Sequence, residues 1–216
     1  MPLVALVTSS KFPNLTADDR LLLAPLAERG IHAKPAIWDD PTATWSSYDG
    51  IILRSTWDYH LKTEKFLRSI DALEDTTAPL WNPPALIRWN ANKTYLQALD
   101  SKGGAVVPTI WPEAGDRANL RERLQEQGWQ QAVVKPLISA TAYRTQLVTL
   151  ENAGTAQALF EELREGPGVM VQRFMNSVVD EGGRSSFSIA CSATRSSRLR
   201  KPATSACRVT SAAAIE

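Results

Sequence analysis

The sequence predicts an α/β fold in which a parallel sheet with helical crossovers is followed by a lobe of mixed strands and helices. Three observations predict this arrangement. Short, almost wholly apolar runs alternate with amphipathic segments over roughly the first 80 residues, a pattern typical of parallel sheets covered by helices. The adjacent residues Pro83 and Pro84 then interrupt the alternation. Beyond them, three further apolar runs with interleaved helical patterns indicate an α+β lobe.

The first part of the chain reads as alternating strands and helices. The apolar run Leu3 to Thr8 predicts a buried strand, and Asp18 to Arg29 has the apolar spacing of a helix. Two more strands are expected at Ile31 to Trp38 and Gly50 to Ser55. A helix over Thr63 to Leu73 follows, with its apolar side chains on one face. This order predicts a parallel sheet, because parallel strands need crossover connections.

The segment Trp81 to Pro84 marks the predicted domain boundary, because prolines remove backbone donors and restrict the residues before them. We therefore expect one domain over residues 1–82 and a second over residues 83–182, with a separate tail over residues 183–216. The elements predicted in the second domain are helices at Asn92 to Ser101, Arg117 to Gln127 and Thr155 to Glu165, and extended segments at Val106 to Trp111, Ala132 to Pro136, Thr145 to Leu150 and Val169 to Phe174.

Composition narrows the class of protein. No early apolar stretch approaches the roughly 18 to 20 residues of a membrane span, so we expect a cytoplasmic protein without a membrane partner. Residues 183–216 carry six basic and one acidic side chain, or +5, so the remainder of a chain with net charge +1 carries −4. That balance predicts no general nucleic-acid surface. Cys191 and Cys207 form no CxxC motif, and His32 and His60 are the only histidines, so no histidine or cysteine metal site is expected.

Three polar residues of the second domain form a candidate site. Lys93 is expected to open a helix, Lys135 ends an apolar strand, and Gln172 lies near the end of another strand. Two fixed lysines could hold a triphosphate, and a strand leading into a linker could supply main-chain groups to an adenine edge. Taken alone, a lysine at a helix start such as Lys93 is usually a solvated surface residue. Lys135 is less easily explained in that way, because a lysine rarely enters an apolar strand without a partner.

The motifs resemble those of a known family when they are taken in order. The chain is similar to the ATP-grasp superfamily on its glutathione-synthetase-like side, and to a bacterial subgroup of carboxylate–amine ligases that includes the cycloserine-pathway type. The segments that carry the resemblance are Arg54 to His60 (RSTWDYH), Leu80 to Lys93 (LWNPPALIRWNANK), Asn90 to Leu99 (NANKTYLQAL), Val106 to Trp111 (VVPTIW), Ala132 to Tyr143 (AVVKPLISATAY) and Val169 to Phe174 (VMVQRF). The resemblance implies a Rossmann-like pre-ATP-grasp domain followed by an ATP-grasp domain that is incomplete in this chain.

The resemblance also implies roles for individual residues. Lys93 and Lys135 would contact the phosphates, and Arg54 would face an acidic substrate group, unless it only pairs with Asp58. The loop from Ser139 to Tyr143 would close over the phosphates, although it lacks glycine and is followed by Arg144. The whole set of implied ATP-binding residues is Lys93, Lys135, Ser139, Tyr143, Gln172, Arg173, Phe174, Asp180 and Glu181. Within that set, Gln172 and the backbone around Phe174 would edge the adenine, and Asp180 or Glu181 would reach the ribose.

The implied activity is a carboxylate ligase. In this family ATP phosphorylates a carboxylate, and an amine or similar nucleophile displaces phosphate from the acyl phosphate, with one or two Mg²⁺ ions bound by residues well beyond the hinge. The implied partners are ATP, Mg²⁺ and a small carboxylate substrate, and the family allows a homodimer. The alternative is a non-catalytic ATP-binding or regulatory protein with a basic tail.

The tail from residue 183 differs from the rest of the chain. It contains eight serines, seven alanines and five arginines in 34 residues, a composition that favours disorder. A neighbouring reading frame permits WSLVFFDGVFSHAVLTPAETGDFRVQ followed by GGSN, which alternates like strands and resembles the family's continuation. We therefore expect a one-nucleotide frameshift near Gly182. It would remove the metal ligands, expose Val169 to Phe174 as a sheet edge and leave the chain inactive. A natural basic tail is the alternative.

Overall fold

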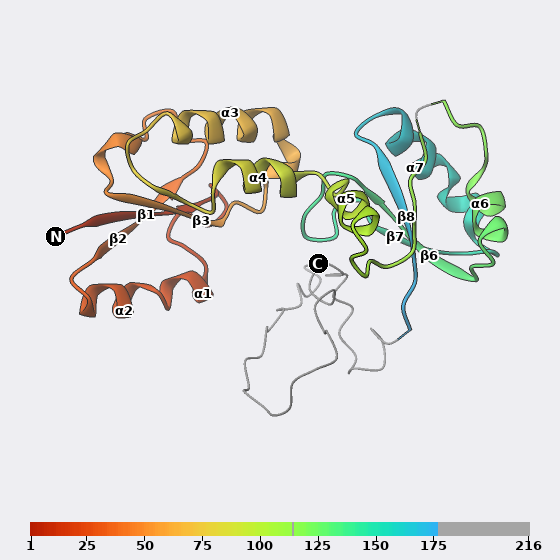
Figure 1. Cartoon of the computed structure of the whole chain (residues 1–216), viewed down its shortest axis with the longest axis horizontal. Helices are drawn as coiled ribbons and strands as arrows, with labels where there is room; N and C mark the ends of the chain where they lie inside the picture. Colours follow the sequence, from red (N-terminus) through yellow and green to blue (C-terminus); the bar gives the residue numbers. More distant parts are fainter. Residues whose placement is uncertain (114, 177–216) are drawn as a thin grey trace. The chain divides into compact units, whose positions relative to one another are not determined.

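The chain forms two compact units in the computed structural model, which describes residues 1–113 and 115–176 (Figure 1). The first unit comprises Met1–Tyr95 together with Ile138–Thr141, and the second comprises Leu96–Leu137 and the described residues from Ala142. The α/β class predicted from the sequence is confirmed, with a parallel sheet in the first unit and an antiparallel one in the second. The predicted tail over residues 183–216 lies outside the described residues.

A four-stranded parallel sheet forms the centre of the first unit. Its strands are β1 (Leu3–Thr8), β2 (His32–Ile37), β3 (Gly50–Ser55) and β4 (Leu80–Trp81), in the order β2-β1-β3-β4. All three strand pairs are parallel, as the alternation of strands and helices predicts. The carboxyl ends of the strands therefore lie at one edge of the sheet, where parallel sheets usually bind ligands.

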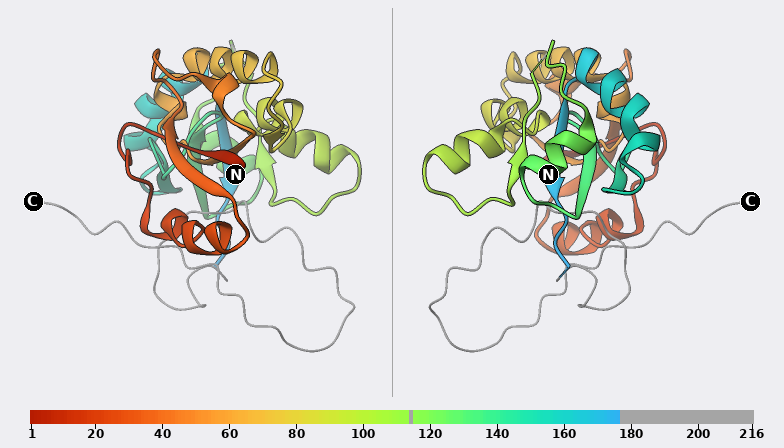
Figure 2. Two further views of the ribbon diagram at one scale, coloured as in Figure 1. Left: turned by 90° about the vertical axis from the view of Figure 1, so that its left-hand side faces the viewer. Right: turned by 90° about the vertical axis from the view of Figure 1, so that its right-hand side faces the viewer.

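Helices cover both faces of this sheet. Figures 1 and 2 show α3 (Thr63–Glu74) on one face and α1 (Ala17–Arg20) and α2 (Leu23–Glu28) on the other. The spacing of Phe66, Ile70 and Leu73 places these side chains on the buried face of α3, where they pack against the sheet.

The predicted helix from Asp18 to Arg29 is two short helices instead. Pro25 is the physical reason, because it has no N–H to donate to an earlier carbonyl and is tolerated only in the first turn of a helix. α2 begins at Leu23, so Pro25 lies within that first turn.

The proline pair also begins a helix that the sequence reading did not predict. Pro83 precedes α4 (Pro84–Ala91), and Pro84 occupies its first turn, where a missing N–H costs nothing. Ile87 joins the core of the first unit, so α4 belongs to that unit. Lys93 lies in the turn after α4, and α5 (Tyr95–Ser101) follows.

The second unit contains an antiparallel sheet in the order β5-β8-β6-β7. Its strands are β5 (Thr109–Ile110), β6 (Gln131–Pro136), β7 (Gln146–Thr149) and β8 (Val169–Arg173). The expectation that the last of these strands would be an exposed edge is wrong. β8 lies between β5 and β6, because the extended segment around Pro108 supplies two residues that pair with it.

Two helices cover this sheet and complete its core. They are α6 (Leu120–Glu126) and α7 (Ala153–Glu165), which bury Leu124 and Phe160 against the apolar strand residues. α6 begins at Leu120, later than predicted, because its N-cap Asn119 and Glu122 form a capping box that satisfies two backbone donors.

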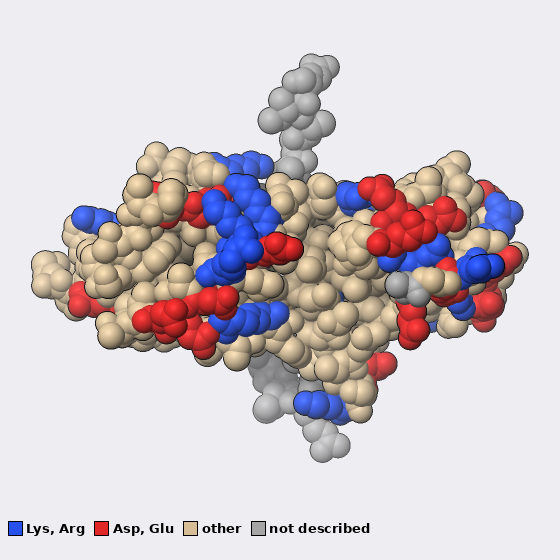
Figure 3. Space-filling model, turned by 90° about the horizontal axis from the view of Figure 1, so that it is seen from above, with Lys and Arg blue, Asp and Glu red and all other residues tan. Residues whose placement is uncertain are grey.

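Charged side chains are mixed on the face that contains α3. Figure 3 shows basic and acidic groups next to one another there. The ion pairs include Arg88 with Asp71 and Glu74, and Lys65 with Asp39. Exposed pairs of this kind contribute at most about 1 kcal/mol each. Within the described ranges, no helix has the length and apolar character needed to cross a membrane.

Candidate nucleotide site

Lys135 is held inside the second unit by a chain of side-chain hydrogen bonds. It lies on β6 and is 8% exposed, and its Nζ donates to Gln172 Oε1 at 2.8 Å. Gln172 lies on the neighbouring strand β8, opposite Val133, so the two side chains form a diagonal cross-strand pair. Both residues belong to the two inner strands of the sheet, which hold side chains more rigidly than a surface loop does.

The Gln172 amide has its orientation fixed from the other side by Thr109. Gln172 Nε2 donates to Thr109 Oγ1 at 3.2 Å, and Thr109 Oγ1 donates in turn to the carbonyl of Val107 at 2.7 Å. Because the Thr109 hydroxyl proton is donated to Val107, the Thr109 oxygen can only accept a hydrogen bond from the NH₂ group of Gln172. The carbonyl oxygen of the same amide then faces Lys135. Gln172 is 1% exposed, so reversing this amide would leave buried polar groups unsatisfied.

Lys93 is held differently, by one main-chain acceptor in the first unit. Its Nζ donates to the carbonyl oxygen of Ser139 at 2.7 Å. Burial lowers the pKa of Lys93 to about 8, because a desolvated ammonium is less stable than one in water. In the described part of the chain this amine forms no ion pair. A bound anion would therefore relieve a desolvation cost that the single hydrogen bond to Ser139 offsets only in part.

The loop that follows β6 contains the residues expected to close over phosphates. Ser139 is buried, whereas Tyr143 is 43% exposed. Thr141, Ala142 and Arg144 have φ values of 51°, 58° and 50°, which lie in the left-handed region that favours glycine. Each such residue costs about 1 kcal/mol or more, so the loop is held in a strained conformation. Arg144 pairs with Glu162 of α7, which fixes the end of this loop.

The backbone at the end of β8 is largely engaged by the sheet. The N–H of Arg173 donates to Pro108 O at 2.9 Å, and the N–H of Phe174 donates to Gln131 O at 3.1 Å. A purine edge at this strand would therefore meet carbonyl oxygens before it met free N–H groups. Asp180 and Glu181, expected near the ribose, lie outside the described residues.

Arg54 has a partner other than the one weighed from the sequence. Its Nε donates to Asp19 Oδ1 at 2.8 Å, so the suggested pair with Asp58 is wrong. Asp58 accepts instead from Trp38 Nε1 at 2.8 Å. Burial alone would raise the pKa of Asp19, but hydrogen bonds from Ser55 and Arg54 outweigh this effect. The pKa of Asp19 is therefore below its ordinary value, and the carboxyl stays ionised. Sequence spacing could not identify this pair, because Asp19 lies on α1, 35 positions before Arg54.

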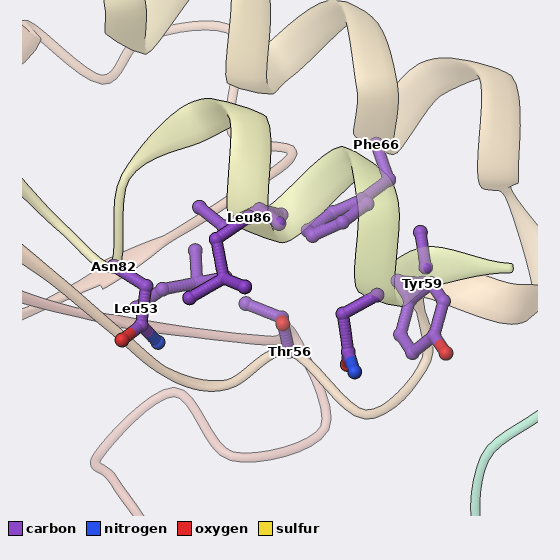
Figure 4. A pocket seen from close by; sticks show the side chains of 9 residues that line it. Leu53, Thr56, Tyr59, Phe66, Asn82 and Leu86 are labelled. Atoms are coloured by element: carbon purple, nitrogen blue, oxygen red, sulfur yellow. The ribbon is translucent and has the colours of Figure 1, made fainter. Parts of the chain in front are cut away.

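A small cavity lies at the carboxyl edge of the parallel sheet (Figure 4). Its volume is about 250 Å³. Thr56 and Asn82 enter it directly after β3 and β4, and α4 supplies Leu86 and Asn90. None of these residues was a candidate from the sequence, since single threonines and asparagines carry no spacing signal.

Comparison with known proteins matches the architecture just described. Residues 4–82 match the family model of the N-terminal domain of D-cycloserine synthetase DcsG. The chain is 30% identical over 188 residues to the cycloserine biosynthesis protein DcsG of Streptomyces lavendulae, a match that covers 84% of this chain and 62% of that protein. It also resembles the crystal structure of D-cycloserine synthetase DcsG, with a TM-score of 0.72 and 27% identity, over 82% of this chain and 60% of that one. These matches bear out the resemblance to ATP-grasp ligases of the cycloserine-pathway type that the sequence motifs indicated.

A more distant structure shares the ATP-grasp fold. The RimK domain ATP-grasp protein of Sphaerobacter thermophilus matches 80% of this chain and 64% of its own, with a TM-score of 0.60 and 22% identity. The present chain thus spans about three fifths of the length of the ATP-grasp proteins it matches. The resemblance stated from the sequence motifs is confirmed at the level of the fold.

Both lysines that are expected to contact phosphates lie among the described residues. Lys93 offers a desolvated amine to an anionic oxygen, and Lys135 lies on a rigid strand. Over residues 1–113 and 115–176, no group of three or more His, Cys, Asp or Glu side chains could hold a metal ion. Magnesium ligands were expected beyond residue 182, outside this range.

Proposed function

We propose that this chain is the nucleotide-holding part of an ATP-dependent carboxylate ligase. The observation that carries the proposal is the Lys93 amine, which is partly buried and has no counter-ion in the described part of the chain. The ATP-grasp fold and the similarity to DcsG support an anionic nucleotide as its ligand. In this proposal Lys93 and Lys135 bind phosphate oxygens, and Gln172 orients Lys135.

The proposed reaction forms an acyl phosphate. An oxygen of the substrate carboxylate attacks the γ-phosphorus, ADP leaves, and an amine or similar nucleophile then attacks the acyl carbon and expels phosphate. Negative charge grows on the β–γ bridging oxygen as that bond breaks, and two fixed ammonium groups stabilise it. Mg²⁺, bound by residues beyond those described, would neutralise the remaining phosphate charge.

We propose that each predicted domain has its own part in this function. Residues 1–82 contribute to substrate recognition, with Arg54 facing an acidic group, and residues 83–182 hold the nucleotide. Residues 183–216 are proposed to be read from a shifted frame, so the 216-residue chain binds ATP but does not turn it over. Resequencing the locus tests this directly, because one uninterrupted frame that encodes the same tail in related loci would end the proposal.

Calorimetric titration with ATP, with and without Mg²⁺, tests the nucleotide site. The 216-residue chain is expected to bind ATP, and Lys93→Met or Lys135→Met is expected to weaken binding about 10- to 100-fold, since each removes a charged phosphate contact. Arg68→Met is a matched control, because Arg68 lies on the exposed side of α3. Absence of ATP binding would refute the proposed site.

Turnover by a frame-restored version separates the two functional alternatives. Magnesium-dependent ATP consumption by the restored protein with a carboxylate and an amine supports a ligase. Binding without turnover by both versions favours a non-catalytic nucleotide-binding protein. Magnesium-dependent turnover by the 216-residue chain itself would contradict the proposed inactivity.

A further inference from the structure

The cavity at the carboxyl edge of β3 and β4 has a buried apolar floor and a more exposed polar rim. Phe66 and Ile87 are buried in the floor, whereas Asn82 and Asn90 lie at exposed positions on the rim. Figure 4 shows Thr56 near the middle of the group, with Asn82 to one side and Tyr59 to the other. A ligand in this cavity would meet hydrogen-bonding groups from two strand ends and from α4.

Two of these polar side chains have no hydrogen bond to the protein. Thr56 is 6% exposed, yet within residues 1–113 and 115–176 neither its hydroxyl nor the Asn82 carboxamide has a side-chain hydrogen-bond partner. The Thr56 oxygen is not among the buried unsatisfied atoms, and Asn82 is exposed, so both groups are open to a ligand or to water that enters the cavity.

The lining contains no charged side chain. It consists of Leu53, Thr56, Tyr59, Phe66, Asn82, Leu86, Ile87, Asn90 and Ala91. Burial raises the pKa of the Tyr59 hydroxyl, so Tyr59 remains neutral near pH 7. An ionised ligand that entered this cavity would lose its hydration and would meet no side chain of opposite charge in the lining. An uncharged ligand would lose less hydration free energy and could form hydrogen bonds with the hydroxyl and carboxamide groups.

We propose that this cavity binds a small uncharged molecule, with a hydrogen-bonding head directed at Thr56 and Asn82 and a short apolar chain against Phe66 and Ile87. Its volume of about 250 Å³ lies below the roughly 300 to 1,000 Å³ of sites for drug-sized ligands. The ligand is therefore of fragment size. This site requires neither the nucleotide nor either lysine, so it goes beyond the proposed ligase function.

Three isosteric probes test the proposal by NMR on the full 216-residue chain without nucleotide. Butyramide is expected to shift the side-chain amide signals of Asn82 and Asn90 saturably. Butyrate and butylammonium, which have nearly the same shape but carry a charge, are expected to leave them unshifted at equal concentration. Shifts of equal size with butyrate, or no saturable shift with butyramide, would overturn the proposal.

Thr56→Val removes the hydroxyl while keeping the shape of the side chain. It is expected to weaken butyramide binding about three- to tenfold, the equivalent of one hydrogen bond. Thr77→Val is the matched control, because Thr77 is exposed and outside the cavity. Unchanged butyramide affinity in Thr56→Val would exclude Thr56 from the site. Because ATP is absent, failure here is distinguishable from failure of the nucleotide site.

Discussion

Lys93 and Lys135 belong to different units and are held by different physical means. Lys135 is on an inner strand and donates to a side chain whose own orientation is fixed by Thr109. Lys93 is in a turn and donates to the Ser139 carbonyl, while burial lowers its pKa. The fold therefore compensates the burial of Lys135 more fully than that of Lys93. Removing Lys135 should damage the fold, whereas removing Lys93 should mainly damage ligand binding.

The largest expected effect concerns Lys93 and pH. In the folded chain its pKa is about 8, against 10.5 for an ordinary lysine, so between these values the unfolded chain binds more protons. The free energy of unfolding should therefore rise with pH in this window, by on the order of 2 to 3 kcal/mol. Urea unfolding of the wild type and of Lys93→Met, from pH 7.5 to 10, measures this rise in the free energy of unfolding. The difference between the two proteins isolates Lys93, since both retain every other titratable group. Parallel pH profiles would contradict the burial of this amine.

Lys135→Met should destabilise the chain, by about 1 to 3 kcal/mol, because it leaves the buried Gln172 carbonyl oxygen without its Lys135 donor. Lys93→Met should instead raise the free energy of unfolding at pH 7, because it removes a desolvated charge. Urea unfolding at pH 7 compares the signs of the two changes. Equal destabilisation by both would remove the distinction drawn between the lysines.

Thr109→Val should lower the free energy of unfolding by about 1 kcal/mol, because Gln172 Nε2 loses its acceptor. It should also weaken ATP binding, since the amide is then free to turn away from Lys135. Thr109→Ser keeps the hydroxyl and should restore ATP affinity. A serine variant that binds ATP as weakly as the valine variant would show that the hydroxyl does not orient Gln172.

The smallest expected effect is at the loop whose Ser139 carbonyl holds Lys93. Ala142 is exposed with φ of 58°, so Ala142→Gly should raise the free energy of unfolding by up to about 1 kcal/mol through relief of strain. Ala140→Gly is the control, since Ala140 has no positive φ. Thermal unfolding of the two variants compares them. Destabilisation by Ala142→Gly would mean that the loop is not strained at this position.

Much of the fold could be predicted because its signals are local. Apolar runs identified β1 and β3, and the periodicity of Phe66, Ile70 and Leu73 identified α3. The wrong helix predictions both involve proline, which can interrupt a helix or occupy its first turn. Pro25 divided a predicted helix, whereas Pro84 began an unpredicted one.

The site was predicted less completely, because its partners are distant in sequence. Lys135 and Gln172 were singled out, and the structure joins them by a hydrogen bond. Thr109 was not singled out, because its role depends on the pairing of β5 with β8. The same pairing places β8 inside the sheet rather than at its edge. Register and long-range contacts of this kind require the folded chain.

Proton uptake on ATP binding tests the central claim most directly. If ATP phosphates contact Lys93, they raise its pKa above about 8, and the complex takes up a proton. Calorimetric titrations at pH 8.5 in two buffers of different ionisation enthalpy measure this uptake. We expect the wild type to take up most of one proton per ATP bound. ATP binding without any proton uptake would contradict contact with Lys93, and absence of binding would contradict the nucleotide site itself.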